Sequence, residues 1–252
     1  MAGQSLVDVL HSERAVVAHH IDAVYVGTAP SPREYVLDFS AVQQLAADGF
    51  VGRESVFADL ERFFTEHDRG YFEIVAEAGL GKTALAAEIA RRADAIPFFA
   101  SASGGHTRPE QFLTHMCGAL ITRHNLDYDH LPARAGSDAA FLDCILREVS
   151  GRGPGRREIL VVDALDEADD PRIGANPLLL PPSLPAGVYV VVTRRPPAPE
   201  LLRYPGTPAR RRELRRDDPE QNADIDAFLR SRLAARTPGV TAPLGTSGAS
   251  RA

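Results

Sequence analysis

The chain has 252 residues, of which 44% are hydrophobic, and it carries a formal net charge of −6. This length and apolar content exclude a disordered or fibrous chain and predict one main domain with a sizeable core. Basic and acidic residues are interspersed, which argues against a protein whose main role is to coat nucleic acid or an anionic membrane.

The N-terminal sequence and the cysteines favour a cytoplasmic location. Acidic and His residues interrupt the apolar positions of residues 1–20, so neither a signal peptide nor a transit peptide is indicated. The longest apolar runs, such as 159–162 and 188–192, are far shorter than the ~20 residues that span a bilayer. Cys117 and Cys144 lie in runs with helical apolar spacing, and we expect both to be small buried residues in a reducing compartment.

The predicted elements alternate between helix and strand after an N-terminal extension, residues 1–45, that has no identifiable chemistry. Within this extension, a helix is indicated at 6–18 and an extended stretch at 23–26. The expected helices that follow are 54–64, 83–93, 109–124, 138–149 and 218–235, and the expected strands are 71–75, 97–101, 158–163, 187–193 and, more weakly, 210–214. The last stretch, 236–252, is rich in small residues, Pro and Gly and is expected to be disordered. Such alternation predicts a parallel sheet with helices on both faces.

A phosphate-binding loop is predicted where the first strand meets the next helix. Residues 76–83 read AEAGLGKT, and they follow a strand and open a helix, which is the context that a Walker A loop requires. Glycines in such a loop let consecutive N–H groups converge on a phosphate, and the helix N-terminus adds about half a positive charge. Lys82 is expected to reach the terminal phosphates and the Thr83 hydroxyl to bind Mg²⁺. The expected nucleotide contacts in this loop are Ala78, Gly79, Leu80, Gly81, Lys82, Thr83 and Ala84.

Two features qualify this loop. The usual pattern begins with Gly where this chain has Ala76, and Ala would cost about 1–2 kcal/mol if the position needed a left-handed backbone. Of the 28 Lys and Arg residues, only Lys82 is lysine, which suggests a position where a planar guanidinium does not serve. The alternative interpretation of these letters is an ordinary glycine-containing turn.

An acidic cluster follows the apolar strand 158–163 and is typical of a Walker B motif. Asp163, at the carboxyl end of this strand, is expected to hold Mg²⁺ beside the phosphate loop, largely through water. Asp166 and Glu167 lie one turn onward, and one of them, with Glu167 favoured, is expected to orient and deprotonate the attacking water. The alternative is a solvated acidic loop.

The strand 187–193 ends in a polar group and a cation, at the sheet edge where ligands bind in open α/β folds. Thr193 and Arg194 are therefore candidate sensors of the γ-phosphate, although a surface Arg pair capping the strand is the alternative.

Adenine is favoured over guanine because the common NKxD guanine motif needs a second lysine, and Lys82 is the only lysine in the sequence. The Arg-rich stretch 203–216 alternates with acids, which favours a solvated face over a nucleic-acid site.

The motifs FVGRE at 50–54, AEAGLGKT, LVVDALDE and VVVTRRP, in this order, resemble the STAND class of AAA-related signalling ATPases, including its NACHT-type members. The resemblance covers about residues 46–235 and extends to bacterial members that precede WD or other repeats. It implies an α/β three-layer P-loop NTPase sandwich, with about five mostly parallel strands in the order 5-1-4-3-2. It also implies a switch in which ADP holds a closed monomer and ATP permits assembly into an oligomer.

In proteins of this class the FVGRE segment helps to hold adenine, so the resemblance implies adenine contacts at Val51, Gly52 and Arg53. Members of the class normally continue into a winged-helix region and a repeat sensor, which the printed sequence lacks. We therefore expect either a truncated reading frame or a separately encoded sensor or effector partner.

The leading functional hypothesis is an ATP- and Mg²⁺-dependent signalling ATPase with slow turnover, in which ATP or ADP controls conformation and homo-oligomerisation. One alternative is a DNA-associated AAA+ ATPase of the initiator or loader type, which shares these motifs. Another is a nucleotide-binding oligomerisation module without hydrolysis.

Overall fold

A computed structural model describes residues 29–47, 50–153, 155–168, 176–197 and 206–218 of the chain. Five strands form one sheet in the order β2-β3-β4-β1-β5, and every neighbouring pair is parallel. The strands are β1 (Gly70–Ala76), β2 (Ile96–Phe99), β3 (Glu158–Asp163), β4 (Val188–Arg194) and β5 (Ala209–Leu214). This confirms the predicted α/β fold and the strand order 5-1-4-3-2, which is the same order described from the opposite edge.

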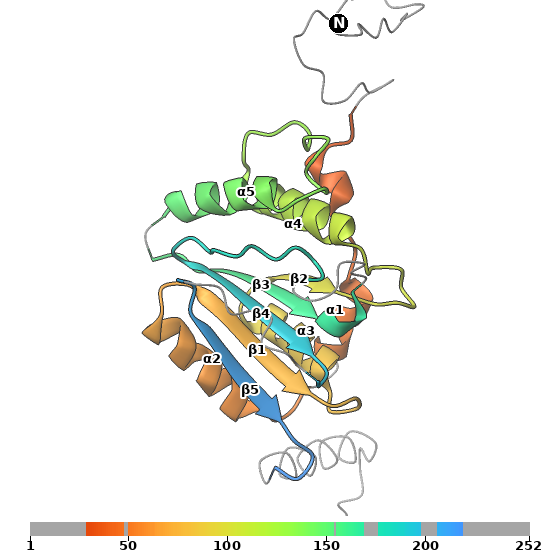
Figure 1. The fold of residues 1–252 in the computed structure, drawn as a ribbon, viewed down its shortest axis with the longest axis vertical. Helices are drawn as coiled ribbons and strands as arrows, with labels where there is room; N and C mark the ends of the chain where they lie inside the picture. The colour runs from red at the N-terminus through yellow and green to blue at the C-terminus, as the bar shows by residue number, and fades with distance from the viewer. Residues whose placement is uncertain (1–28, 48–49, 154, 169–175, 198–205, 219–252) are drawn as a thin grey trace, which may run out of the picture.

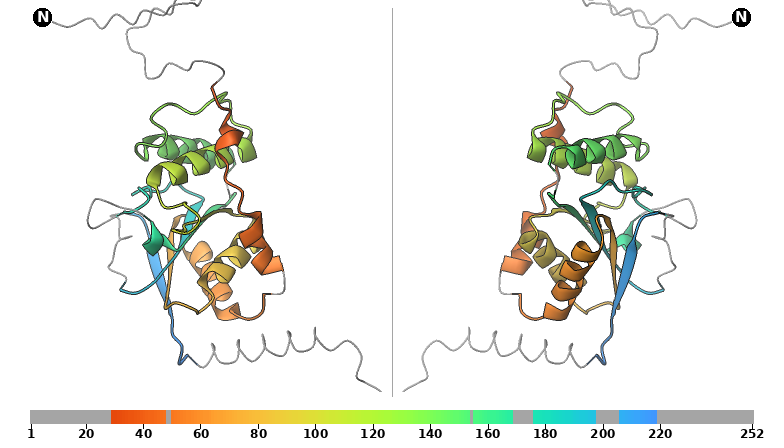
Figure 2. Two further views of the ribbon diagram at one scale, coloured as in Figure 1. Left: turned by 90° about the vertical axis from the view of Figure 1, so that its right-hand side faces the viewer. Right: turned by 90° about the vertical axis from the view of Figure 1, so that its left-hand side faces the viewer.

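Helices pack on both faces of this sheet (Figures 1 and 2). They are α1 (Ser40–Ala47), α2 (Glu54–Glu66), α3 (Lys82–Arg92), α4 (Pro109–His124) and α5 (Ala140–Gly151), with short 3-10 turns at η1 (Pro32–Tyr35) and η2 (Leu165–Glu167). The crossover through α3 runs from β1 to β2, and the crossover through α4 and α5 runs back from β2 to β3. Because parallel crossovers are right-handed, opposite directions along the sheet place these helices on opposite faces.

The depth of each strand follows its sequence. Every residue of β1, β3 and β4 is buried, as expected for β-branched runs covered on both faces. By contrast, β5 lies at the sheet edge and is largely exposed or half-buried, since its sequence ARRREL offers little apolar surface. Helix α2 buries Val56, Leu60, Phe63 and Phe64, whose spacing forms one apolar face. The predicted site is therefore carried by the most buried part of the sheet.

Residues 29–47 pack against the domain, a contact that no pattern in the sequence predicted. Phe39 is buried in the core, and its ring meets those of Phe98 and Phe99 edge-on. The Leu37 N–H donates to Nδ1 of the buried His115 in α4 at 2.9 Å. A Cβ at Gly118 would lie 2.3 Å from the Pro32 carbonyl oxygen, so this glycine permits the close approach of η1 to α4. The segment thus contributes a buried residue, Phe39, to the core.

Several predicted boundaries differ from those observed, and some predictions concern other parts of the chain. Strand β2 ends at Phe99, because Ser101 turns away into an antiparallel bridge with His106. Helix α5 begins at Ala140, because the Asp138 side chain accepts a hydrogen bond from the Ala140 N–H and ends the preceding turn. The elements predicted at 6–18 and 23–26, the helix at 218–235 beyond its first residue, and the tail 236–252 lie outside the described residues. Among the residues described here, no helix combines the length and apolar character needed to cross a bilayer.

Candidate functional site

The predicted phosphate loop connects β1 to α3 at the carboxyl edge of the sheet. Gly79 and Gly81 both have left-handed backbones, with φ of 82° and 76°, and Gly81 is the N-cap residue of α3. A Cβ at Gly81 would meet nothing within 4 Å, so glycine is needed there for its backbone conformation and not for space. Ala76 is the last residue of β1 and is not among the described residues with positive φ. The absence of the usual first glycine therefore carries no backbone cost.

The Lys82 side chain folds over this loop from the first turn of α3. Its Nζ donates to the Ala76 carbonyl oxygen at 2.7 Å and to the Glu77 carbonyl oxygen at 2.8 Å. Burial lowers the pKa of Lys82, and the charge of Asp166 is the largest opposing influence. The ammonium is thus held at the loop and within electrostatic reach of the acidic cluster.

Asp163 lies at the end of β3, buried to 2% exposure, and meets both the loop and β4. The Thr193 hydroxyl donates to Asp163 Oδ1 and accepts from the Ala164 N–H at 3.0 Å. Burial raises the pKa of Asp163, while hydrogen bonds from Thr193 and Thr83 and the charge of Lys82 oppose that rise. The predicted meeting of Lys82, Thr83 and Asp163 is therefore observed, with Thr193 bracing the carboxylate from the intervening strand.

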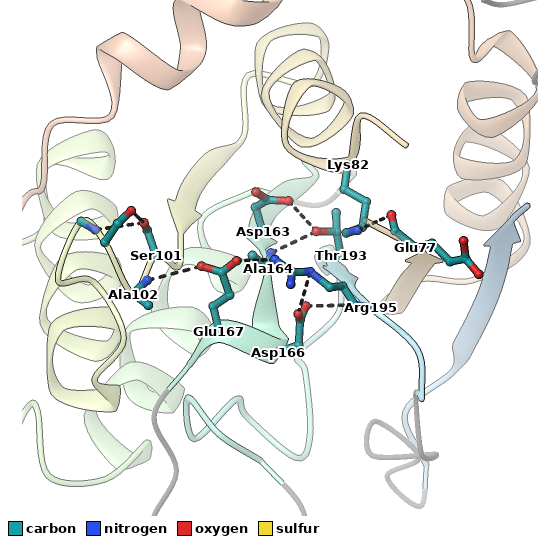
Figure 3. Close-up of polar contacts among 12 residues, drawn as sticks. Glu77, Lys82, Ser101, Ala102, Asp163, Ala164, Asp166, Glu167, Thr193 and Arg195 are labelled. Carbon is teal, nitrogen blue, oxygen red and sulfur yellow. Dashed lines mark hydrogen bonds and ion pairs between the residues drawn. The ribbon is translucent and has the colours of Figure 1, made fainter. Parts of the chain in front are cut away.

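Asp166 and Glu167 lie in η2, just beyond Asp163, and both bind Arg195 (Figure 3). The Arg195 N–H donates to Asp166 Oδ1 at 2.9 Å, and Arg195 Nε lies 3.3 Å from Asp166 Oδ2. One Nη of Arg195 donates to Glu167 Oε1 at 2.6 Å. The second carboxylate oxygen of Glu167 accepts from the Ala102 N–H, just beyond β2, at 3.3 Å. Glu167 thus connects the segment that follows β2 to the residue that follows β4.

Arg194, the predicted sensor, does not face this cluster. Its side chain is 3% exposed and its Nε pairs with the buried Glu73 of β1, which also binds Nε of Arg211 in β5 at 2.5 Å. Successive side chains of a strand point to opposite faces of the sheet. Because the Thr193 side chain points toward Asp163, the Arg194 side chain points to the opposite face. The cation beside the acids is Arg195, which the sequence interpretation passed over. The period-2 alternation of the strand could have identified it.

The FVGRE segment reaches the loop through Arg53. This residue is the left-handed N-cap of α2, and one of its Nη atoms donates to the Leu80 carbonyl oxygen at 2.8 Å. Val51 and Gly52 precede it and are half-buried. On the other side of the loop, an Nη of Arg216 donates to the Ala78 carbonyl oxygen at 3.3 Å. Arginines from α2 and from the end of β5 therefore fix the loop backbone.

A metal ion held by the residues of this site would need further ligands, such as water or phosphate oxygens. Among the described side chains, no group of three or more His, Cys, Asp and Glu is placed to hold a metal ion. One carboxylate and one hydroxyl suffice for Mg²⁺, which keeps several waters and shares phosphate oxygens. Thr83 and Asp163 could supply that pair, and Ala84, which follows Thr83 in α3, is half-buried. No protein-family model matches the chain, and comparison with curated proteins gave no significant match.

Proposed function

We propose that this protein is a Mg²⁺-dependent ATP-binding switch that hydrolyses ATP slowly. The observation that carries the proposal is the convergence of a glycine-shaped loop, the Lys82 ammonium and the buried Asp163 carboxylate at the carboxyl edge of a parallel sheet. Ligands of open α/β sheets bind at this edge, and helix N-termini favour anions there. Adenine is the base we propose, because the chain has no second lysine for the common guanine motif.

Each residue has a defined part in this proposal. Lys82 exchanges its hydrogen bonds to the loop carbonyls for bonds to phosphate oxygens, and the backbone N–H groups of residues 78–84 bind the remaining oxygens. Thr83 and Asp163 hold the magnesium ion, which neutralises phosphate charge. Glu167 accepts the proton of the attacking water, with Asp166 as the alternative base. Arg53 supports the loop near the nucleoside, as the STAND resemblance implies for FVGRE.

Isothermal titration calorimetry of Lys82→Ala tests the binding part. Loss of a charge-assisted phosphate contact is expected to weaken Mg–ATP binding by about 100-fold or more. Arg62→Ala is the matched control, since Arg62 is an exposed cation paired with the neighbouring Asp59 on α2, and the change should leave the affinity unchanged. Equal ATP affinity in Lys82→Ala and the control would remove the basis of the proposal.

Turnover and assembly form the second part. Glu167→Gln is expected to retain ATP binding while phosphate release slows by about 100-fold, the typical contribution of a general base. Size-exclusion chromatography with light scattering should show larger assemblies with Mg–ATP than with Mg–ADP, and no such difference in Lys82→Ala. Bound nucleotide with no phosphate release from the wild type would favour the inert oligomerisation module. We place the switch in the cytoplasm, and we propose that its assembly partner in the ATP-bound state is a second copy of this chain.

A further inference from the structure

Arg195 binds the two acids of η2 at the same time. Its backbone N–H and its Nε both contact the Asp166 carboxylate, while an Nη contacts Glu167 at 2.6 Å. Glu167 has its other oxygen on the Ala102 N–H. Both oxygens of the carboxylate that is expected to accept a proton are therefore already engaged by donors.

The two arginines at the end of β4 differ in their surroundings. The Arg194 side chain is buried and its pair with Glu73 joins β4 to β1, so it acts as a fixed structural contact. The Arg195 side chain is 48% exposed, and the side chains of Asp166 and Glu167 are 25% and 29% exposed. Partly exposed ion pairs of this kind contribute little net stability, so other charges can displace them. Arg195 is thus the arginine that is free to change partners.

The position of Arg195 exposes it to an anion in the loop. Figure 3 shows its guanidinium between the η2 acids and the Lys82 side chain. A phosphate bound at Lys82 would therefore also attract Arg195 away from its carboxylates.

We propose that Arg195 is a positioning residue that clamps Asp166 and Glu167, and that a terminal phosphate in the loop draws its guanidinium away and releases Glu167. The inference rests on the proposed nucleotide function and deepens it. ATP carries the third phosphate and therefore opens the clamp, which frees Glu167 to act as a base. ADP lacks this phosphate and leaves Arg195 bound to Glu167. Part of the binding energy of ATP is consequently used to separate Arg195 from Glu167.

A double-mutant cycle measured by calorimetry tests the clamp. The proteins are the wild type, Glu167→Gln, Arg195→Gln and the double variant, each titrated with Mg–ATP and with Mg–ADP. Glu167→Gln weakens the clamp, so it should tighten ATP relative to ADP by about twofold to fivefold, the factor expected for one partly exposed ion pair. In the Arg195→Gln background the same change should leave the ATP-to-ADP affinity ratio unaltered. Arg215→Gln, which removes an exposed arginine paired with Glu213, is the control and should preserve the wild-type ratio.

Three results would overturn the inference. An equal gain for ATP in both backgrounds would mean that removing a negative charge acts through the general field and not through Arg195. An unchanged ATP-to-ADP ratio in Glu167→Gln would mean that no clamp opposes ATP. Absence of nucleotide binding by the wild type would overturn the proposed function together with the clamp, whereas either of the other two results leaves that function standing. Thermal melts of all variants confirm that each is folded.

Discussion

Replacing Thr193 by Val should both destabilise the protein and disturb the proposed magnesium site. Thr193 is fully buried, and its hydroxyl donates to the Asp163 carboxylate while it accepts the Ala164 N–H. Valine keeps the shape of threonine but can neither donate nor accept a hydrogen bond, so the buried Asp163 carboxylate and the half-buried Ala164 N–H each lose a partner. A hydrogen bond to a charged group contributes about 1.5–3 kcal/mol and an unsatisfied buried group costs about 1–3 kcal/mol, so we expect a loss of roughly 2–4 kcal/mol in the free energy of unfolding.

Urea denaturation at pH 7, followed by circular dichroism, measures this loss. Thr193→Ser is the control, because serine keeps the hydroxyl and loses only a methyl group, and it should cost about 1 kcal/mol. In Thr193→Val the loss of a donor that favours the ionised carboxylate should also raise the pKa of Asp163 further and weaken Mg–ATP binding most at low pH. Equal destabilisation by Val and Ser would refute the claim that Thr193 acts through its hydroxyl.

Two further predictions concern buried titratable groups. Burial lowers the pKa of His115 from the usual 6.5 to about 4, so the neutral ring costs no stability above pH 6.5, and stability is lost as the pH falls, by roughly 3 kcal/mol at pH 4. Urea denaturation of the wild type and His115→Gln at pH 7 and pH 4 should show a smaller pH difference in the variant. Equal differences would contradict this account. The raised pKa of Asp163 means that stability falls as the pH rises through the interval above the usual aspartate value, so Asp163→Asn should increase the free energy of unfolding at pH 7 but not at pH 3.5, while abolishing Mg²⁺-dependent ATP binding. A less stable Asp163→Asn protein at pH 7 would count against burial as the dominant influence.

Local patterns were sufficient for the strands and the phosphate loop. The runs that form β3 and β4 are continuously apolar and buried on both faces, so their periodicity, turn residues and length identify them without knowledge of their neighbours. The two loop glycines and Lys82 lie within residues 79–82, and their geometry depends on the backbone of only a few residues. The strand order, in contrast, came from the resemblance to a known class and not from these local patterns.

Contacts between segments that are distant in the chain could not be predicted from the sequence. Residues 29–47 have a weak amphipathic pattern, and only the meeting of Phe39 with β2 and of Leu37 with His115 shows that they belong to the core. The partner of Arg194 is Glu73, which lies 121 positions earlier in the chain (194 − 73), and the pairing of β1 with β4 brings the two side chains together.

The sequence by itself therefore determined which residues form the loop, the carboxylate at the end of β3 and the η2 acids, because each lies in a short run with its own backbone requirement. Only the tertiary structure decided that Arg195, and not Arg194, joins the acids. That choice depends on which face of β4 turns toward Asp163, and the packing of β4 between β3 and β1 sets that face.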